Sequence, residues 1–355
     1  VPYRIGPFET LKQCSGDTIE YDHSVADAIE KEVDQLGADG QLLRNGDGPT
    51  RVTLLEKILL PGLVKMANVI PEGGVWLNTQ RPEWNDANNA LVGHGASMVT
   101  VCYMRRYFAY LKTWLSETAT QEYQIAKSIG QLLEKQLAPL REVVEAESPL
   151  AASTRFELVE RLQRAGEEYR SEIYSDGFDG QQVVLAKSRL LEFFDVALEV
   201  LDRTIVANRR EDGLYHSYNL VSFDGSEIQV DHLQEMLEGQ VAVLSSGALD
   251  PDSACHIMDV LRDSDLYRAD QNSYLLYPDR VLDRFMEKNR VPDEAIEDSE
   301  LLQWLLANND STVIRRDVNG GYHFAGAIRN SAEMKCRLER SEEHTSELQS
   351  HSDLV

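Results

Sequence analysis

Apolar residues recur every three or four positions along most of the chain, which is the spacing of one helix face. The stretches with this spacing are residues 23–36, 51–70, 96–104, 121–145, 156–173, 181–208, 234–249 and 252–262. Pro61 is expected to kink or restart the second stretch, because proline lacks the amide hydrogen that a helix interior uses. The pattern predicts a mainly helical fold in which each helix buries one face.

Two short stretches have the pattern of β-hairpins instead. Residues 214–230 turn at Asp224-Gly225 and residues 312–324 turn at Asn319-Gly320, and both pairs favour type I′ turns. Residues 266–280 are rich in Tyr, Arg and Asp, with little periodicity, which is typical of an ordered loop. Two interpretations of this loop stay open. It is either functional, with Arg268 and Asp270 as substrate contacts, or held in place by tyrosine hydroxyl hydrogen bonds.

The densest polar group of the chain lies between two apolar stretches. Residues 81–89 read RPEWNDANN and follow the apolar piece VWL at 75–77. Polar side chains wedged between buried elements must be hydrogen-bonded or functional, because burying them unpaired is costly. Trp84 stands between Glu83 and Asp86, as in sugar sites where a ring stacks on the pyranose and an acid protonates the glycosidic oxygen. The other interpretation is a cap ahead of a core helix.

The sequence EWNDANN at 83–89, followed by VG at 92–93, resembles a motif of the cellobiose-phosphorylase family and related α/α-barrel glycosidases, DWNDGMN…VG. In that family the second acid of the motif is the general acid, which implies this role for Asp86. Glu83 replaces the family's first Asp. A helix N-terminus favours an ionised carboxylate, so Asp86 needs burial or a neighbouring acid such as Glu83 to raise its pKa. The candidate substrate contacts of this segment are Arg81, Trp84, Asn85 and Asn89.

A second resemblance to the same family lies downstream. Residues 239–251 read GQVAVLSSGALDP, similar to the QxWAVLSG…DP stretch that begins a barrel helix in the family. Val241 stands at the family's Trp, and Gly239 stands at its Gln. Gln240 is a candidate substrate contact. Glu235 or Glu238 is a candidate base for hydrolysis, on position alone.

The first predicted hairpin contains a polar-aromatic cluster, YHSYN at 215–219. Tyr215, His216 and Tyr218 of this cluster are candidate sugar contacts, because aromatic and hydrogen-bonding side chains line such sites. An exposed strand face often has the same composition, so this alternative stays open.

The resemblance implies a mainly α fold, an (α/α)6-type toroid or partial barrel with small β-hairpins, over residues 1–339 as one catalytic-type domain that is incomplete at one or both ends. It also implies cleavage of a glycosidic bond with inversion, by phosphate or by activated water. The family's phosphate loop includes ENGGQY, which NGGYH at 319–323 matches in part, with Val318 where the Glu would be. This departure favours water, with inorganic phosphate as the alternative co-substrate. A non-catalytic helical domain that binds sugars or other proteins is the other function class.

Composition changes the picture mainly by exclusion. The 355 residues are 42% apolar and 27% charged, with a formal net charge of −25. This charge argues against nucleic acid and anionic membranes as partners and suits a neutral oligosaccharide or disaccharide. The four Cys and eight His residues show no metal-binding spacing, so we expect no metal and no cofactor.

The two ends of the chain are atypical. The N-terminus does not look like a signal peptide and lacks an initiator Met, which is typical of a cut end; the cytoplasm is favoured over the periplasm. Residues 340–355 read RSEEHTSELQSHSDLV and resemble a translated sequencing adaptor, so we expect them to be a non-native, disordered tail.

Overall fold

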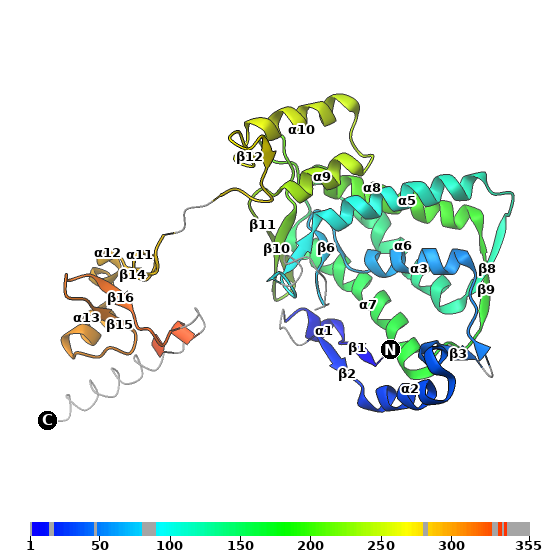
Figure 1. Ribbon diagram of the computed structural model, residues 1–355, viewed down its shortest axis with the longest axis horizontal. Helices are drawn as coiled ribbons and strands as arrows, with labels where there is room; N and C mark the ends of the chain where they lie inside the picture. Colours follow the sequence, from blue (N-terminus) through cyan, green and yellow to red (C-terminus); the bar gives the residue numbers. More distant parts are fainter. Residues whose placement is uncertain are drawn as a thin grey trace. The chain divides into compact units, whose positions relative to one another are not determined.

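The computed structural model describes residues 2–13, 18–45, 48–79, 90–279, 283–328, 333–335 and 337–338. The chain divides into two compact units, Val1–Asp279 and Arg280–Val355. Unit 1 contains the longer helices, and unit 2 is a small mixed unit with its own core (Figure 1).

Helices dominate unit 1, as the apolar spacing predicts. They are α1 (Phe8–Leu11), α2 (His23–Leu36), α3 (Leu54–Met66), α5 (Met98–Glu117), α6 (Lys127–Glu145), α7 (Ala152–Asp176), α8 (Lys187–Ala207), α9 (Leu237–Ser245) and α10 (Pro251–Asp263), with a 3-10 turn at Gly37–Gln41. α3 runs through Pro61 as a single element. The largest core cluster is built by the buried faces of α3, α5, α6, α7 and α8, including Leu59, Phe108, Leu133 and Phe193.

The close approach of α3 to α5 depends on a glycine. A Cβ at Gly62 would lie 2.5 Å from Cε1 of Phe108, well inside van der Waals contact. Phe108 in turn packs against Phe193 and Phe194 of α8, with ring centroids 6.1 and 5.6 Å away. The absence of a side chain at position 62 therefore lets the aromatic centre of the core reach α3.

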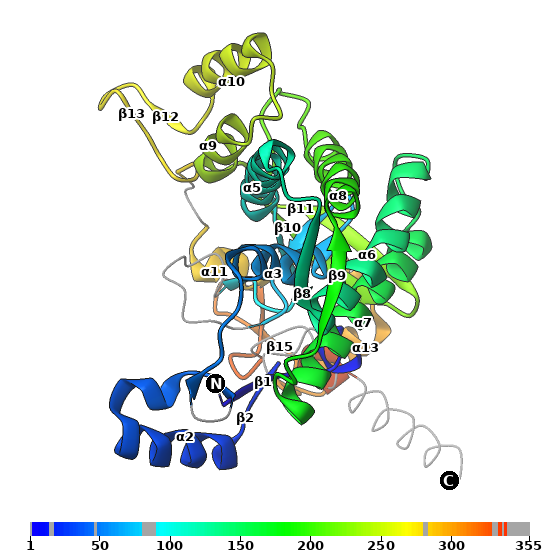
Figure 2. The same cartoon turned by 90° about the vertical axis from the view of Figure 1, so that its right-hand side faces the viewer.

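Two of the predicted helices begin as strands. β8 (Glu122–Ala126) and β9 (Gln182–Ala186) pair antiparallel, Glu122 opposite Ala186 and Ala126 opposite Gln182. The helical interpretation of residues 121–126 and 181–186 is wrong because these short segments complete each other's backbone hydrogen bonds across the strand pair, which local periodicity does not reveal. In both views the ladder lies beside the helices of unit 1 (Figures 1 and 2).

At the other end of the helices lies an antiparallel five-stranded sheet in the order β11-β10-β7-β6-β5. Its strands are β5 (Val69–Ile70), β6 (Gly74–Trp76), β7 (Gly95–Ser97), β10 (Tyr218–Asp224) and β11 (Glu227–His232). β10 and β11 form the first predicted hairpin, with Gly225 and Ser226 between the paired Asp224 and Glu227. The sheet extends beyond this hairpin because β7 pairs with β10 on one side and with β6 on the other.

The remaining elements of unit 1 lie at its periphery. β1 (Tyr3–Ile5) pairs with β2 (Ile19–Tyr21), and β3 (Arg44–Asn45) pairs with β4 (Gly48–Pro49). The predicted loop 266–280 contains a short antiparallel pair, β12 (Tyr267–Arg268) with β13 (Ser273–Tyr274).

Unit 2 has a core of Val291, Ile296, Leu305, Val313 and Ile314. Its strands form a sheet in the order β14-β16-β15, and the second predicted hairpin is confirmed as β15 (Ile314–Arg316) with β16 (Tyr322–Phe324). The other elements are α11 (Phe285–Lys288), β14 (Arg290–Val291), α12 (Asp293–Glu297) and α13 (Glu300–Ala307). The mainly helical class is thus confirmed for the described residues of the whole chain, whereas a closed toroid stays a prediction.

Candidate functional site

Six of the predicted site residues fall in the segment 80–89, outside the described residues. They are Arg81, Glu83, Trp84, Asn85, Asp86 and Asn89. The structure describes how the chain is held on either side of this segment. The backbone amide of Gly93 donates to the carbonyl of Leu77 at 2.7 Å, and Trp76 Nε1 donates to the carbonyl of Gly93 at 2.8 Å. The two flanks are therefore joined to each other between β6 and β7.

Tyr218 and Glu238, both predicted from the sequence, lie together. The Tyr218 hydroxyl donates to Oε2 of Glu238 at 2.7 Å. Tyr218 is buried at the start of β10, and Glu238 is partly exposed in the first turn of α9. A carboxylate beside a phenol at the end of a sheet can accept or donate a proton, so this pair is the best-defined acid–base candidate among the described residues.

Gln240 and Tyr215 are joined through the backbone. The Gln240 side chain is fully buried, and it accepts from the Tyr215 amide at 2.9 Å while donating to the Tyr215 carbonyl at 2.7 Å. Ser217 strengthens the same junction, because its hydroxyl accepts from the Gly239 amide at 2.8 Å. These bonds fix the start of α9 against β10, so Gln240 positions Glu238 here; contact of Gln240 with a sugar stays a prediction.

His216 stacks on His232, with ring centroids 4.0 Å apart and planes inclined by 6°. Burial lowers the pKa of His216 to about 4, and the neighbouring ring of His232 adds to this effect. The imidazole is therefore neutral at physiological pH and offers hydrogen bonds rather than charge. His232 has no counterpart among the residues predicted from the sequence.

Arg268 and Asp270 bond to each other at the tip of the β12–β13 pair. Arg268 Nη2 lies 2.8 Å from Oδ2 of Asp270, and both side chains are exposed. The strand pair is tied to the site because the Leu237 amide donates to the Leu276 carbonyl at 2.8 Å. Arg268 and Asp270 have no described bond to the Tyr218–Glu238 pair, and their predicted contact with substrate stays a prediction.

A buried ion cluster centred on Glu72 was missed in the sequence. Glu72 has a φ of +63° and its side chain is 4% exposed. The carboxylate accepts from Arg203 Nη2 at 3.0 Å, from the Ser148 hydroxyl at 2.8 Å and from the Leu150 amide at 2.7 Å. Arg155 adds a contact at 3.4 Å. The only sequence signal was a lone Glu in the Gly-rich turn PEGG, because its partners lie far along the chain.

The Glu72 cluster holds the turn that leads into β6 and the motif segment. Arg155 Nε donates to the Pro71 carbonyl at 3.1 Å, and Asn208 Nδ2 donates to the Glu72 carbonyl at 2.9 Å. Burial alone would raise the pKa of Glu72, but the bonds from Leu150, Ser148 and Arg203 outweigh burial and hold the pKa below its ordinary value. The carboxylate therefore stays ionised and fixes the chain before the predicted acid.

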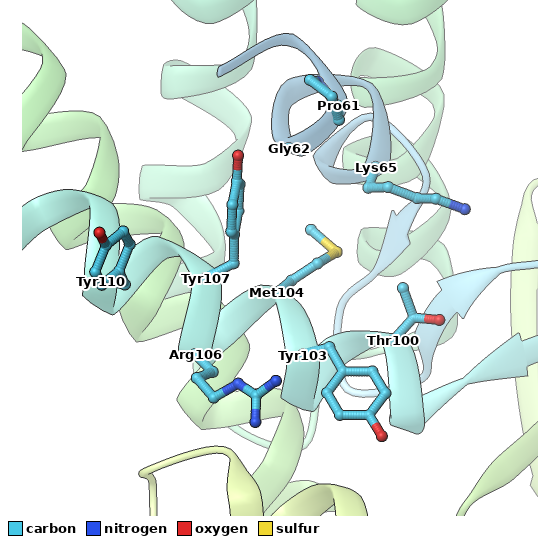
Figure 3. A pocket seen from close by; sticks show the side chains of 9 residues that line it. All are labelled: Pro61, Gly62, Lys65, Thr100, Tyr103, Met104, Arg106, Tyr107 and Tyr110. Carbon is cyan, nitrogen blue, oxygen red and sulfur yellow. The ribbon is translucent and has the colours of Figure 1, made fainter. Parts of the chain in front are cut away.

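A groove of about 620 Å³ runs between α3 and α5, and its lining includes none of the described residues that were predicted for the site (Figure 3). It is lined by Pro61, Gly62, Lys65, Thr100, Tyr103, Met104, Arg106, Tyr107 and Tyr110. The Tyr107 hydroxyl donates to the Ile58 carbonyl, whereas Tyr103 and Tyr110 are 46% and 66% exposed. Exposed tyrosine rings of this kind are surfaces on which a pyranose can stack.

Two further searches concern the described residues alone. Within them, no three His, Cys, Asp or Glu side chains are placed to hold a metal ion. No helix in the same part of the chain has the length and apolar character needed to cross a membrane.

Comparison with known proteins gives one family match. Residues 282–354 match the family described as GH149 phosphorylase insertion domain 2, and this range covers nearly all of unit 2. No curated protein matches the chain. The similarity supports a relationship to glycoside phosphorylases, whose substrates are carbohydrates, without singling out the cellobiose phosphorylases. The matched range also includes most of residues 340–355, whose origin in an adaptor stays a prediction.

Proposed function

We propose that this chain is part of a glycoside phosphorylase, in which inorganic phosphate cleaves a glycosidic bond with inversion and Asp86 is the general acid. The observation that carries the proposal is the match of residues 282–354 to an insertion domain of phosphorylases. It comes from a part of the chain separate from the EWNDANN sequence at 83–89, so two independent stretches favour the same chemistry.

The family match also changes the proposed nucleophile. Val318 replaces a Glu of the family's phosphate loop, which by itself favours water. The neighbouring residues nevertheless form a tight polar turn: Asp317 Oδ1 accepts from the amides of Asn319 and Gly321, both at 2.8 Å. His323 Nε2 lies 2.9 Å from Oδ2 of the same Asp. The Asp317 carboxylate thus occupies the amides of this turn, and the choice of phosphate as the attacking group rests on the match to a phosphorylase insertion domain alone.

Glu238 has a different proposed role in phosphorolysis from the one that hydrolysis requires. A hydrolase needs a second carboxylate to activate water, whereas a phosphorylase does not. Glu238 accepts a hydrogen bond from the Tyr218 hydroxyl and lies in the first turn of α9, where its side chain can also bind a sugar hydroxyl. We assign it to substrate binding next to Tyr218, with the hydrolytic base as its role only if water attacks.

The groove between α3 and α5 supports a carbohydrate ligand under either function class. Tyr103 and Tyr110 lie one above the other on the same side of α5, seven residues and therefore about 10 Å apart along the helix axis. Two exposed rings at this spacing suit a saccharide of more than one unit. The same groove would also serve a non-catalytic sugar-binding domain, so turnover has to separate the two functions.

The experiment is a phosphate-dependence assay on the full 355-residue chain. We expect an oligosaccharide panel to yield a sugar 1-phosphate only when inorganic phosphate is present, and the reverse reaction to extend an acceptor from a sugar 1-phosphate donor. NMR of the anomeric proton of the first product gives the stereochemistry. Equal release of free sugar with and without phosphate means that water attacks. Binding without turnover in any condition means that the chain is a binding domain.

A further inference from the structure

The stacked pair of His216 and His232 lies where the β10–β11 hairpin meets the connection that leads to α9. His232 ends β11 and lies opposite Asn219 of β10, and His216 lies two positions before the first residue of β10. Their ring centroids are 4.0 Å apart with planes inclined by 6°, so the rings lie face to face. Such a stack is favourable for neutral rings and unfavourable for two cations.

The hydrogen bonds of the pair fix one tautomer in each ring. His216 Nδ1 lies 3.1 Å from the Leu233 carbonyl, and a carbonyl only accepts, so Nδ1 carries the proton. His232 Nδ1 lies 2.8 Å from Oδ1 of Asn219. The amide nitrogen of that Asn donates to the Gly73 carbonyl and to Oδ1 of Asn208, which assigns its oxygen to the histidine. Both neutral rings therefore hold their proton on Nδ1.

The charged groups that face the pair come from the neighbouring strands and loops. Arg210 lies near both rings, and it is itself bonded to Asp212 at 2.7 Å and to Glu235 at 3.3 Å. Asp212 acts electrostatically on His216, and Asp231, the neighbour of His232 in β11, acts on His232. Burial and Arg210 oppose protonation of both rings, while the two aspartates favour it. Burial is the largest influence on each ring, so the pKa of each lies below its ordinary value.

His216 also contacts residues 233–236, the connection between β11 and α9 that leads to Glu238. Its Nδ1 donates to the carbonyl of Leu233, the first residue of this connection. The hydroxyl of Ser217 donates to the carbonyl of Met236, the last residue of the connection, at 3.1 Å. Glu238 follows two residues later and accepts from Tyr218 of the same strand. The position of Glu238 relative to Tyr218 therefore depends on a connection that the histidine stack keeps in place.

We propose that His216 and His232 form an acid-sensitive latch that positions Glu238 against Tyr218. In the neutral pair the stack holds residues 233–236 between β11 and α9. Protonation of both rings places two cations face to face beside Arg210, with His216 partly buried and His232 exposed, so the rings repel each other and the connection loosens. The latch is closed above the ordinary titration range of histidine and opens as the pH falls below it. Its effect on turnover rests on the proposed function, whereas its effect on the connection does not.

The first test is an NMR titration of the full chain with ring-labelled histidine. We expect His216 to titrate near pH 4 in the wild type. In His232→Asn, whose amide nitrogen can replace the Nδ1–H donor while the ring is lost, we expect the pKa of His216 to rise by about one unit or more. The matched control is His256→Asn, which removes an exposed histidine of α10 and should leave His216 unchanged.

The second test is hydrogen exchange of the backbone amides of residues 233–239, corrected for the intrinsic pH dependence. Linkage predicts that protection falls by about tenfold between pH 7 and pH 5, because the released histidine binds protons that the stacked one does not. The latch is overturned if His216 titrates within half a unit of its ordinary value, if the His232 and His256 variants shift it equally, or if protection does not change with pH. An inactive chain that passes both tests refutes the proposed function alone.

Discussion

The carboxylate of Glu72 and the guanidinium of Arg203 are bonded at 3.0 Å in the interior, although 131 positions separate them in the sequence. Arg203 also donates to the carbonyl of Val143 in the last turn of α6 and to those of Ala146 and Glu147 directly after it. One buried ion pair thus joins α8, the end of α6 and the turn before β6. Buried pairs of this kind are costly to break from one side, because the remaining charge loses its partner.

Glu72→Gln is expected to lower the free energy of unfolding by about 3–5 kcal/mol, because it leaves Arg203 and Arg155 without a counter-charge. The matched control is Glu142→Gln, which breaks an exposed ion pair with Arg161 and should cost less than about 1 kcal/mol. Chemical denaturation of both variants measures the difference. Equal losses would mean that the buried cluster contributes no more than a surface pair.

The same carboxylate predicts a pH dependence of stability. Because the pKa of Glu72 is lower in the folded chain than in the unfolded one, the unfolded state binds more protons in the acid range. The contribution of Glu72 to stability is therefore fully present above about pH 4.5, its unfolded value, and is lost as the pH falls further. Unfolding curves between pH 3 and pH 6 should show a smaller acid loss in Glu72→Gln than in the wild type.

Asp86→Asn is expected to slow cleavage of an unactivated oligosaccharide by ~10²–10⁴-fold, the usual contribution of a general acid. Substrates with good leaving groups, such as aryl glycosides, need little protonation and should be partly spared. Substrate affinity should change little, because Asn keeps the shape of the side chain. Equal loss on both substrates, or no loss on either, removes Asp86 from this role and makes Glu83 the next candidate.

Tyr218→Phe is expected to reduce kcat/KM by about tenfold, since a hydrogen bond to a charged group contributes ~1.5–3 kcal/mol and this one is partly exposed to solvent. The loss should appear without a comparable loss of stability. Tyr267→Phe is the control, because it removes a hydroxyl that donates to Asn272 at an exposed site. Steady-state kinetics with thermal melts of both variants separate a role in the site from a structural one.

Tyr103→Ala and Tyr110→Ala are expected each to weaken oligosaccharide binding by ~1–3 kcal/mol, the scale of losing an aromatic contact. Tyr277→Ala, at an exposed position outside the groove, is the control and should bind as the wild type does. Isothermal titration with oligosaccharides of increasing length tests the spacing argument. Affinity that is independent of both tyrosines would place the ligand elsewhere.

Helical periodicity predicted the mainly helical class because most helices of unit 1 bury a single continuous face. It failed at residues 122–126 and 182–186, where each five-residue strand is stabilised by a partner that local sequence does not reveal. The five-stranded sheet was missed for the same reason, since β5, β6 and β7 have two or three residues each. Short strands leave little periodicity to detect.

For the site, the sequence singled out Tyr218 in a hairpin and Glu238 in the helix that follows it. In the structure these two side chains are hydrogen-bonded to each other. Local sequence gave no indication of Glu72, whose partners come from α7, α8 and the connection before α7. It also missed His232, because a stack across a hairpin depends on register rather than on composition. Asp86 and its neighbours lie outside the described residues, so their role stays a prediction.

The β8–β9 ladder has a consequence for the order of folding. Its pairing joins the residues just before α6 to those just before α8, so α6 and α7 together form a closed loop. Where this loop closes, the Lys127 amide donates to the Gln181 carbonyl at 2.9 Å. Closing a loop costs entropy that grows only with the logarithm of its length, and contacts between near neighbours form fastest. We therefore expect α6 and α7 to pair early, so that the ladder then closes a loop already shortened by their packing. Glu72 and Arg203 lie on either side of the α6–α7 hairpin in the sequence, so we expect their contact to form after this hairpin.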